Sequence, residues 1–341
     1  MRTSNMFGPD ATFLGVPRAD LEEESSYAGA GAVIVGAPFD GGTSHRPGCR
    51  FGPQAIRLTD YLPHDGSRPH LALGVDPLVE LGVVDAGDVV MPPGDIELGL
   101  GRLEEAVARI SDSGSVPVVL GGDHTIALPD VTGVARSKGF GRISVLHFDA
   151  HADTGDTQFG SLYGHGTPMR RLIESGATRG DRFLQIGLRG YWPEPETLDW
   201  MADRRMRSYE MTEVVQRGLD QCLTEAFAIA MDECDGVFLS VDVDVVDPGM
   251  APGTGTPEPG GLTGRQLLDA VRRIACELPV VGLDVVEVSP PYDHAEVTAF
   301  LANRVVLEVL SGIAWRRRSR SGRAVRRPED PLLERARDAG P

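Results

Sequence analysis

The sequence predicts an α/β fold in which helices cover both faces of a central parallel sheet. Short apolar runs without polar alternation recur along the chain, as is typical of strands that are buried on both faces. Stretches with helical spacing separate these runs, which favours parallel strands joined by helices. Histidine and aspartate follow several runs directly, where ligands gather in open α/β sheets. With 41% hydrophobic residues among 341, the chain has enough apolar side chains for a substantial core.

The first half of the chain begins with an irregular lead-in. Residues 1–30 show no sustained hydrophobic period and are acidic around residues 22–24. The first strand opens into residues 38–48, whose many glycines and prolines indicate a long shaped loop. Loops of this size in compact domains are often functional. In this half we expect strands at 32–36, 81–85, 118–120 and 145–148, and helices at 52–57, 96–110 and 126–135.

The second half continues the alternation and ends in a basic tail. Thr263 is a suitable N-cap for a helix, and residues 248–261 form a loop rich in proline and glycine. Because no repeat or linker precedes residue 312, we expect a single domain over 31–314. Residues 315–341 are rich in arginine and then in proline and charge, so we predict a solvated, disordered tail. We expect strands at 183–187, 237–241 and 280–286, and helices around 214, around 226, at 263–276 and at 297–310.

The amino-acid composition argues against a nucleic-acid-binding protein and against a membrane protein. The net charge of −17 and the pI of about 4.9 argue against a nucleic-acid partner and are compatible with a cationic substrate. Four cysteines are scattered without CxxC spacing, so we expect reduced thiols in a cytoplasmic protein. No apolar run approaches the roughly 20 residues of a membrane span, and no apolar leader follows the first residues. We therefore expect no membrane partner.

Histidines and aspartates follow three of the apolar runs and suggest a metal site. In Asp-x-His-x-Asp and Asp-x-Asp, alternate residues face the same side of an extended segment. One such segment could simply cap a helix or line a solvated sheet end, but three of them after strands favour a site with two metal ions. Carboxylates and imidazoles without thiolate suit Mn²⁺, with zinc or nickel still open, and two ions lower the pKa of a water between them. The candidate ligands are His124, Asp149, His151, Asp153, Asp242 and Asp244.

The same residues resemble a known family. Gly-Gly-Asp-His at 121–124, Asp-Ala-His-Ala-Asp at 149–153 and Ser-Val-Asp-Val-Asp-Val-Val-Asp-Pro at 240–248 look like the three signatures of the ureohydrolases. That family includes arginase, agmatinase, guanidinobutyrase and proclavaminate amidinohydrolase. The resemblance extends from about residue 33 to 310, including the segments 251–257 and 287–293. It implies an arginase-like three-layer α/β/α sandwich, a catalytic role for this domain, and homo-oligomers, either trimers or hexamers.

The resemblance also implies roles for single residues. Glu287 would pair with a substrate guanidinium, His165 would shuttle protons to the leaving amine, and Asp153 would help to orient the attacking hydroxide. The reaction would release urea and a primary amine. His147 lies inside a predicted strand, so we interpret it as a core histidine with satisfied hydrogen bonds. One metal would be held by His124, Asp149, Asp153 and Asp242, and the other by Asp149, His151, Asp242 and Asp244.

The segments that would bind the part of the substrate beyond its guanidinium group favour a small guanidino compound other than arginine. Residues 154–160 depart from the asparagine- and serine-rich segment of arginases, whereas residues 37–48 resemble agmatinase and proclavaminate amidinohydrolase. We therefore expect agmatine, cleaved to putrescine and urea, with guanidinobutyrate or a proclavaminate-type compound as the alternative. A catalytically silent structural protein is a further alternative, which the complete set of ligands disfavours. Asp156 or Asp40 could receive the distal cation of agmatine, and His45 and Arg46 could receive a distal carboxylate.

Overall fold

A parallel eight-stranded sheet forms the centre of the computed structural model, which describes residues 11–59, 61–62, 69–327 and 329–330. The strands follow the order β2-β1-β3-β8-β7-β4-β5-β6, and every neighbouring pair is parallel. The carboxyl ends of all the strands therefore lie at one edge. The strands are β1 (Ala32–Ala37), β2 (Val84–Asp88), β3 (Val116–Gly121), β4 (Ile143–Phe148), β5 (Phe183–Leu188), β6 (Arg207–Glu210), β7 (Gly236–Asp242) and β8 (Val280–Val286).

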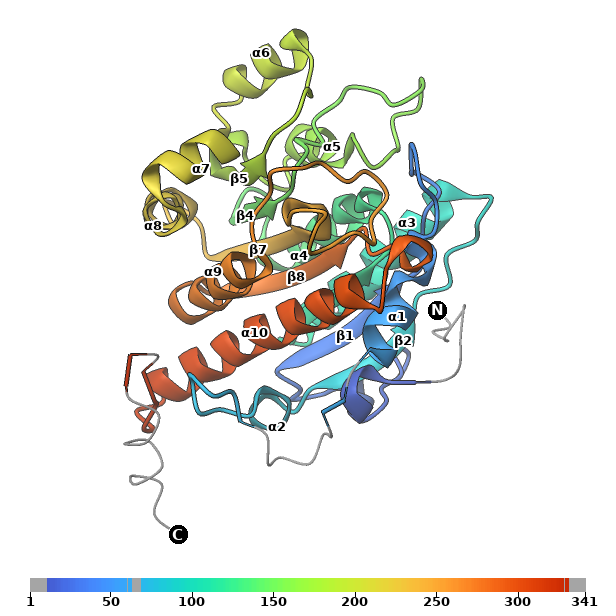
Figure 1. Ribbon diagram of the computed structural model, residues 1–341. Coiled ribbons are helices and arrows are strands. Elements are labelled where there is room, and N and C mark those ends of the chain that lie inside the picture. Colours follow the sequence, from blue (N-terminus) through green and yellow to red (C-terminus); the bar gives the residue numbers. More distant parts are fainter. Residues whose placement is uncertain (1–10, 60, 63–68, 328, 331–341) are drawn as a thin grey trace.

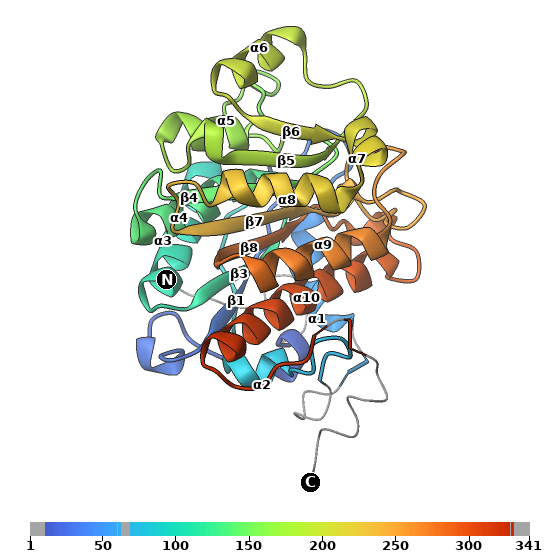
Figure 2. The ribbon, with the colours of Figure 1, turned by 90° about the vertical axis from the view of Figure 1, so that its left-hand side faces the viewer.

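Helices cover both faces of this sheet and complete a three-layer α/β/α sandwich, as predicted. On one face lie α8 (Leu219–Ala230), α9 (Gly264–Glu277) and α10 (Val297–Arg320), which Figure 2 shows side by side. On the other lie α3 (Ile96–Asp112) and α4 (Ala127–Lys138), behind the sheet in Figure 1. The shorter helices are α1 (Gly52–Leu58), α2 (Pro77–Leu81), α5 (Pro168–Ser175), α6 (Pro195–Asp203) and α7 (Met211–Arg217).

The apolar strands contribute side chains to two hydrophobic cores, one on each face of the sheet. Within β3, Val118 and Leu120 pack with α8, α9 and α10, whereas Val119 packs with α3 and α4. Because successive side chains of a strand point to opposite faces, a strand between two helical layers has no polar face. This explains why these strands read as continuous apolar runs.

Several elements differ from the sequence predictions. The run that begins at Leu81 spans the end of α2, a left-handed Gly82 with a φ of 58° and the start of β2, so the strand begins three residues later than predicted. Strand β6 and helices α5 and α6 were not predicted. β6 is short, polar and at the edge of the sheet, where the apolar pattern of a buried strand is absent.

The last helix is longer than predicted. α10 ends at Arg320 rather than near Leu310, because Ile313 and Ala314 are still buried in the core. Residues 315–320 are therefore helical and not part of a disordered tail; residue 328 and residues 331–341 lie outside the described residues. By length and composition alone α10 could cross a membrane, but 72% of its apolar window is buried in the fold, as in the core helix of a soluble protein.

Candidate metal centre and active site

The candidate ligands follow four strands that are neighbours in the sheet. The order β3-β8-β7-β4 brings together the segments that begin after Gly121, Val286, Asp242 and Phe148. Parallel strands present their carboxyl ends at the same edge, which is where open α/β sheets bind ligands. Residues that are up to 166 positions apart, from Gly121 to Glu287, thus meet in one place.

The first group of candidate ligands surrounds His124. Its Nδ1 lies 2.9 Å from Asp149 Oδ2, 3.1 Å from Asp153 Oδ2 and 3.3 Å from Asp242 Oδ2. The ring is 1% exposed, yet Nδ1 has no hydrogen-bond partner of acceptable geometry. A buried polar atom without a partner is costly in a folded protein. A cation between the imidazole and the carboxylates would satisfy it.

The second group surrounds His151. Its Nδ1 lies 3.1 Å from Asp244 Oδ2 and 3.5 Å from Asp149 Oδ1, so Asp149 belongs to both groups. Asp244 Oδ2 is buried and has no hydrogen-bond partner. Its other oxygen is used by the protein, because Asp244 Oδ1 accepts the Ala150 N–H at 3.1 Å.

The electrostatics of the two groups also fit divalent cations. Burial, together with the charges of Asp244 and Asp149, raises the pKa of Asp242 well above its usual range. Burial alone would lower the pKa of His151, but Asp244 and Asp149 raise it to about 12. Four aspartates in a dry site repel one another without a counter-charge. Two dications would offset this repulsion, so the residues present fit a binuclear centre.

His147 is a satisfied core histidine, as predicted, and it also contacts the cluster. It is fully buried in β4, with Nε2 2.8 Å from Asp149 Oδ2. Its Nδ1 accepts from Gln185 Nε2 at 3.2 Å, and the same amide donates to the carbonyl of Ala152 at 2.8 Å. With Nδ1 accepting, the ring proton is on Nε2 and is donated to Asp149. His147 therefore orients the aspartate that the two groups share.

Glu287 lies directly after β8 and is held from both sides. Its φ of 64° is in the left-handed region, which non-glycine residues adopt mainly where the surrounding structure imposes it. Oε1 accepts the His124 N–H at 2.9 Å and lies 2.8 Å from His165 Nδ1. Oε2 lies 3.2 Å from the Cys49 thiol. Burial would raise the pKa of Glu287, but His165 and the His124 N–H lower it, so the carboxylate is ionised.

His165 links Glu287 to the loop after β1. Its Nε2 accepts the Ser44 N–H at 3.1 Å and lies 2.7 Å from Ser44 Oγ. A backbone N–H can only donate, so the proton of the neutral ring is on Nδ1, facing Glu287. Burial would lower the pKa of His165, but Glu287 raises it to about 9. Glu287 thus stabilises the protonated ring, which in that state has a proton to donate.

Sequence reasoning missed Ser44 and Cys49 because their roles depend on contacts made across the chain. Both lie in the loop after β1, which the sequence marks only as long and shaped. It missed Arg189 as well, whose guanidinium donates to the carbonyls of Asp244 and Glu258, both at 2.6 Å. Arg189 thereby supports the segment that carries Asp244. Only its position directly after β5 could have drawn attention to it.

The two acidic residues predicted to bind the distal cation of the substrate, Asp40 and Asp156, both form ion pairs within the protein. Asp40 is ion-paired with Arg50 and also accepts the Gly48 N–H at 3.0 Å. Asp156 is exposed and lies 3.1 Å from Arg171. Both carboxylates therefore already have partners within the protein, and the structure does not bring Asp156 into the group around Glu287.

The two basic candidates belong to the loop beside Glu287. His45 is exposed, and the Arg46 guanidinium lies over the Tyr292 ring, 5.2 Å from its centroid. A Cβ at Gly255 would lie 3.2 Å from both the Arg46 carbonyl and Glu287 Oε2. The backbone of Arg46 is therefore close to the carboxylate that is predicted to pair with the guanidinium.

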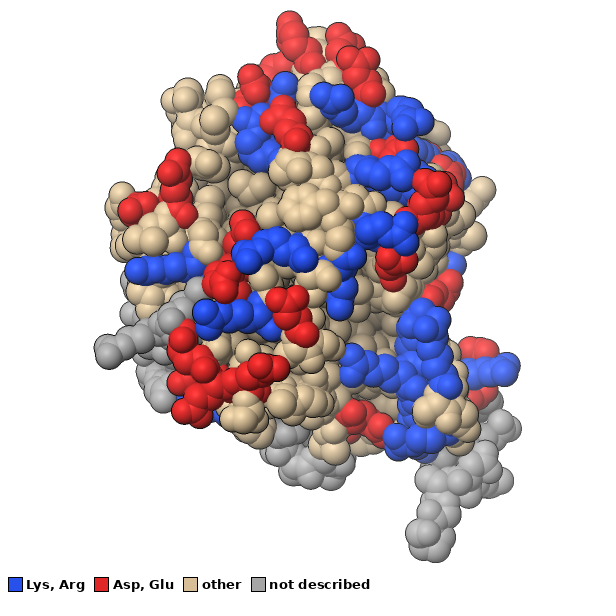
Figure 3. Space-filling model, turned by 180° about the vertical axis from the view of Figure 1, so that it is seen from behind, with Lys and Arg blue, Asp and Glu red and all other residues tan. Residues whose placement is uncertain are grey.

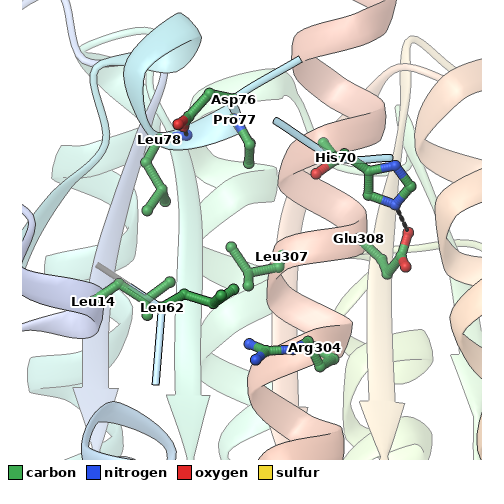
Figure 4. A pocket seen from close by; sticks show the side chains of 10 residues that line it. Leu14, Leu62, His70, Asp76, Pro77, Leu78, Arg304, Leu307 and Glu308 are labelled. Carbon is green, nitrogen blue, oxygen red and sulfur yellow. Dashed lines mark hydrogen bonds and ion pairs between the residues drawn. The ribbon is translucent and has the colours of Figure 1, made fainter. Parts of the chain in front are cut away.

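A cavity of about 150 Å³ lies elsewhere, between α2 and α10 (Figure 4). His70 Nε2 is 2.9 Å from Glu308 Oε2 at its wall, and this carboxylate also pairs with Arg272 at 3.1 Å. None of the candidate ligands lines this cavity, so it is separate from the site at the carboxyl ends of the strands. It is lined by Leu14, Leu62, His70, Asp76, Pro77, Leu78, Arg304, Leu307, Glu308 and Ser311.

Comparison with known proteins assigns the chain to a family. Residues 30–312 match the model of the arginase family. The chain is 38% identical over 297 residues to proclavaminate amidinohydrolase of Streptomyces clavuligerus, covering 85% of this chain and 90% of that protein. The solved structure of that enzyme superposes with a TM-score of 0.80 at 35% identity, covering 92% of this chain and all of the other.

Two further relatives carry different names. Guanidinobutyrase of Pseudomonas aeruginosa is 37% identical, covering 89% of this chain and 92% of that protein. Mitochondrial agmatinase of Gallus gallus is 38% identical, covering 89% and 88%. Nearly equal identity to proteins with three different names leaves the substrate open. The matches nevertheless span almost the whole described chain, and the chain belongs to the arginase family, as its three motifs predict.

Proposed function

We propose that the protein is a binuclear-metal hydrolase that cleaves a guanidinium group to urea and a primary amine. The observation that carries this proposal is the buried, ionised carboxylate of Glu287 beside the histidine and aspartate cluster. A carboxylate held in one orientation pairs with a planar guanidinium in a defined geometry. The names of the relatives support the same chemistry.

The cluster would hold two divalent ions, and Mn²⁺ is the ion we propose. Its ligands are carboxylates and imidazoles without thiolate, which suits a hard ion of this kind. Two such ions supply activated water near neutral pH. We assign His124, Asp149, Asp153 and Asp242 to one ion, and Asp149, His151, Asp242 and Asp244 to the other, as the family resemblance implies.

The chain's own residues bind the substrate and move its protons. Glu287 fixes the guanidinium so that its carbon faces the cluster, which reduces the entropic cost of reaching the reactive geometry. Asp153, with a φ of 53° and its carboxylate at the cluster, helps to orient the water. His165 supplies a proton to the leaving amine. It recovers the proton through Ser44, which is exposed to solvent and whose hydroxyl contacts His165 Nε2.

Agmatine is the substrate that we propose first, because residues 37–48 resemble those of agmatinases. A second candidate, 4-guanidinobutyrate, is favoured by a specific observation. Asp40 and Asp156 already pair with arginines, whereas Arg46 lies in the loop beside Glu287. A cation there suits a distal carboxylate.

Urea release by the purified, Mn²⁺-loaded protein tests the proposal. The substrates are agmatine, arginine, 4-guanidinobutyrate, 3-guanidinopropionate and guanidine, with Arg46→Ala as the variant that tests recognition of the distal group. We expect the variant to lose turnover of 4-guanidinobutyrate and to keep that of agmatine. If the protein bound two ions but released urea from none of these compounds, the proposal would be contradicted, and a family member without catalytic activity would be favoured.

Glu287→Gln separates binding of the guanidinium from binding of metal. The amide keeps the shape of Glu287 and removes its charge, so we expect two bound ions and at least a hundredfold lower kcat/KM, about 2.7 kcal/mol at 1.36 kcal/mol per decade. A fully active Glu287→Gln protein would show that this residue does not bind the guanidinium.

A further inference from the structure

A chain of buried polar groups lies behind His124, on the side away from the carboxylates. His124 Nε2 is 2.9 Å from Ser240 Oγ, and Ser240 Oγ is 2.8 Å from Asp284 Oδ1. Ser240 in β7 is paired in register with Asp284 in β8, so the sheet itself sets this contact. The Val241 N–H also donates to Asp284 Oδ1, at 3.3 Å. Ser240 and Asp284 are completely buried.

The directions of these hydrogen bonds follow from the number of protons. A serine hydroxyl has one hydrogen, and an ionised carboxylate only accepts. Ser240 therefore donates to Asp284, and its oxygen accepts the Nε2–H of His124. The ring then has no proton on Nδ1, the atom that faces Asp149, Asp153 and Asp242 at 2.9–3.3 Å.

The opposite direction would block metal binding at this histidine. If Asp284 were neutral and donated to Ser240, the hydroxyl would donate to Nε2 and the ring proton would move to Nδ1. A protonated Nδ1 has no lone pair for a cation. The direction in which Ser240 and Asp284 share their proton therefore decides which tautomer of His124 is present.

A second buried carboxyl group lies above Asp284. Asp130 in α4 is completely buried, and neither of its oxygens has a hydrogen-bond partner among the described residues. Val134, one helical turn later, packs over Gly282, where a Cβ would lie 3.2 Å from it. Gly282 lies two residues before Asp284 in β8, so this packing places Asp130 towards Asp284.

The two carboxyl groups differ in their hydrogen-bond donors. Asp284 accepts hydrogen bonds from the Ser240 hydroxyl and the Val241 N–H, whereas Asp130 accepts none from the described residues. Donors stabilise an ionised carboxylate, and burial without donors favours the neutral acid. Burial and the charge of Asp284 raise the pKa of Asp130 well above its usual range. Burial raises the pKa of Asp284 too, but there the hydrogen bonds from Ser240 and the Val241 N–H oppose the rise. Of the two groups, Asp130 therefore carries the proton.

We propose that Asp284 acts through Ser240 as a positioning residue that holds His124 with its Nδ1 lone pair towards the metal cluster, and that Asp130 stays neutral so that only one negative charge lies behind the ring. This inference rests on the metal centre of the proposed function and on no particular substrate. Asp130, Ser240 and Asp284 are not themselves proposed metal ligands.

Binding of Mn²⁺ to the metal-free full chain tests the proposal, measured by calorimetry and by competition with a chelator. Loss of a group that orients a metal-binding histidine typically lowers metal affinity about 10–100-fold. We expect Asp284→Asn and Ser240→Ala each to show such a loss for one of the two ions, with the other ion bound as in the parent protein. Asp130→Asn replaces a neutral acid by a neutral amide of the same shape and should bind both ions with the parent affinities.

A double-mutant cycle distinguishes a relay from an effect of charge alone. If Asp284 acts through Ser240, the Ser240→Ala/Asp284→Asn protein should bind no more weakly than the weaker single variant, because the path is already broken. Ser240→Thr keeps the hydroxyl and should restore affinity. We also expect saturating Mn²⁺ to restore the urea release of Ser240→Ala, since the serine affects loading of the metal and not the chemical step.

Three outcomes would overturn the inference. Parent affinity for both ions in Ser240→Ala, which removes a single hydroxyl and so tests the relay even if Asp284→Asn does not fold, would show that no relay operates. Additive losses in the double variant would show that Asp284 acts only through its charge. A loss in Asp130→Asn as large as that in Asp284→Asn would refute the neutral state of Asp130. If the parent protein bound no divalent ion, the proposed function itself would be wrong, whereas the three outcomes above would refute only the roles of Asp130, Ser240 and Asp284.

Discussion

At the residue scale, the carboxylate of Glu287 is held by donors from three segments that are far apart in the sequence. His124 and His165 contact one oxygen, and Cys49 contacts the other. The left-handed backbone at Glu287 costs free energy, of the order of 1–3 kcal/mol for such conformations. The contacts that offset this cost also fix the direction of the carboxylate, as the proposed recognition of a planar guanidinium requires.

Cys49→Ala tests how much the thiol contributes. Burial, together with Glu287 and Asp123, raises the pKa of Cys49 well above its usual range, so the thiol is neutral and donates to Oε2. Loss of one hydrogen bond costs about 0.5–1.5 kcal/mol. We therefore expect kcat/KM for the guanidino substrate to fall about two- to tenfold, with metal content unchanged.

The matched control is Cys276→Ala, because Cys276 is a half-buried thiol in α9, away from the cluster. It should leave the kinetics unchanged. Equal kinetics for the Cys49→Ala and parent proteins would mean that the thiol does not help to position Glu287.

Asp130→Asn should change how stability depends on pH. The pKa of Asp130 is raised in the folded state by burial and by Asp284, so the folded protein holds this proton more tightly than the unfolded chain. Its contribution to stability is fully present below the ordinary carboxyl pKa and is lost as the pH rises through the raised value. Because Asn does not ionise, we expect the variant to gain stability relative to the parent protein as the pH rises from about 4.

The measurement is the Tm of both metal-loaded proteins across this range. A difference in Tm that stays constant with pH would contradict a protonated Asp130.

At the element scale, a buried ion-pair network ties α1 to the edge strand β2. Arg57 is completely buried and donates to both oxygens of Asp85, at 2.8 and 3.0 Å, and to Asp88. It also donates to the carbonyl of Gly87 at 3.0 Å. Since α1 follows the loop that carries Ser44 and Cys49, this network anchors one end of that loop.

Arg57→Met should destabilise the protein strongly. It keeps much of the side-chain volume but leaves two buried carboxylates without their cation, which costs about 3–5 kcal/mol for a broken buried pair. We expect a lower midpoint of urea unfolding and reduced turnover, because the loop loses its anchor. Arg136→Met is the control, since its pairs with Glu104 and Glu105 are on the surface and are worth about 0.2–1 kcal/mol. Equal stability of the two variants would show that the network does not hold α1.

The elements also show what could be predicted from the sequence. Strands β3, β4, β7 and β8 are apolar throughout because both of their faces are buried, and the ligands follow them within a few residues. Such a site is encoded locally, in each strand end separately. Asp284 is polar inside β8, but its partners, Ser240 and the Val241 N–H, follow only from the pairing of β8 with β7. Ser44, Cys49 and Asp284 could not be assigned because their roles depend on tertiary contacts.

At the scale of the whole molecule, the negative charge is spread over a surface of mixed sign. On the face behind the view of Figure 1, arginine and lysine alternate with aspartate and glutamate (Figure 3). Pairs between α3 and α4, such as Arg136 with Glu104, account for part of this pattern. The strongest concentration of carboxylates that the protein uses for chemistry is instead buried, at the carboxyl edge of the sheet, where a net negative protein attracts cations.

Removal of metal should therefore destabilise the whole fold and not only abolish activity. Without cations, burial and mutual repulsion raise the pKa values of Asp242 and Asp244, so the metal-free protein loses stability as the pH rises through those values. A ligand that binds only the folded state at 100 times its Kd adds about 2.7 kcal/mol. We expect a chelator to lower the Tm by several degrees and Mn²⁺ to restore it.

The size of this shift should also increase with pH. Metal ligands must be deprotonated, so acid weakens binding, and the same carboxylates repel one another less when they are protonated. Both effects make the difference in Tm between loaded and metal-free protein larger at higher pH. Glu287→Gln should show the same shift as the parent protein, because Glu287 is not among the ligands. Asp149→Ala should show almost none, since Asp149 belongs to both groups around His124 and His151. A full shift in Asp149→Ala would place the ions elsewhere in the protein.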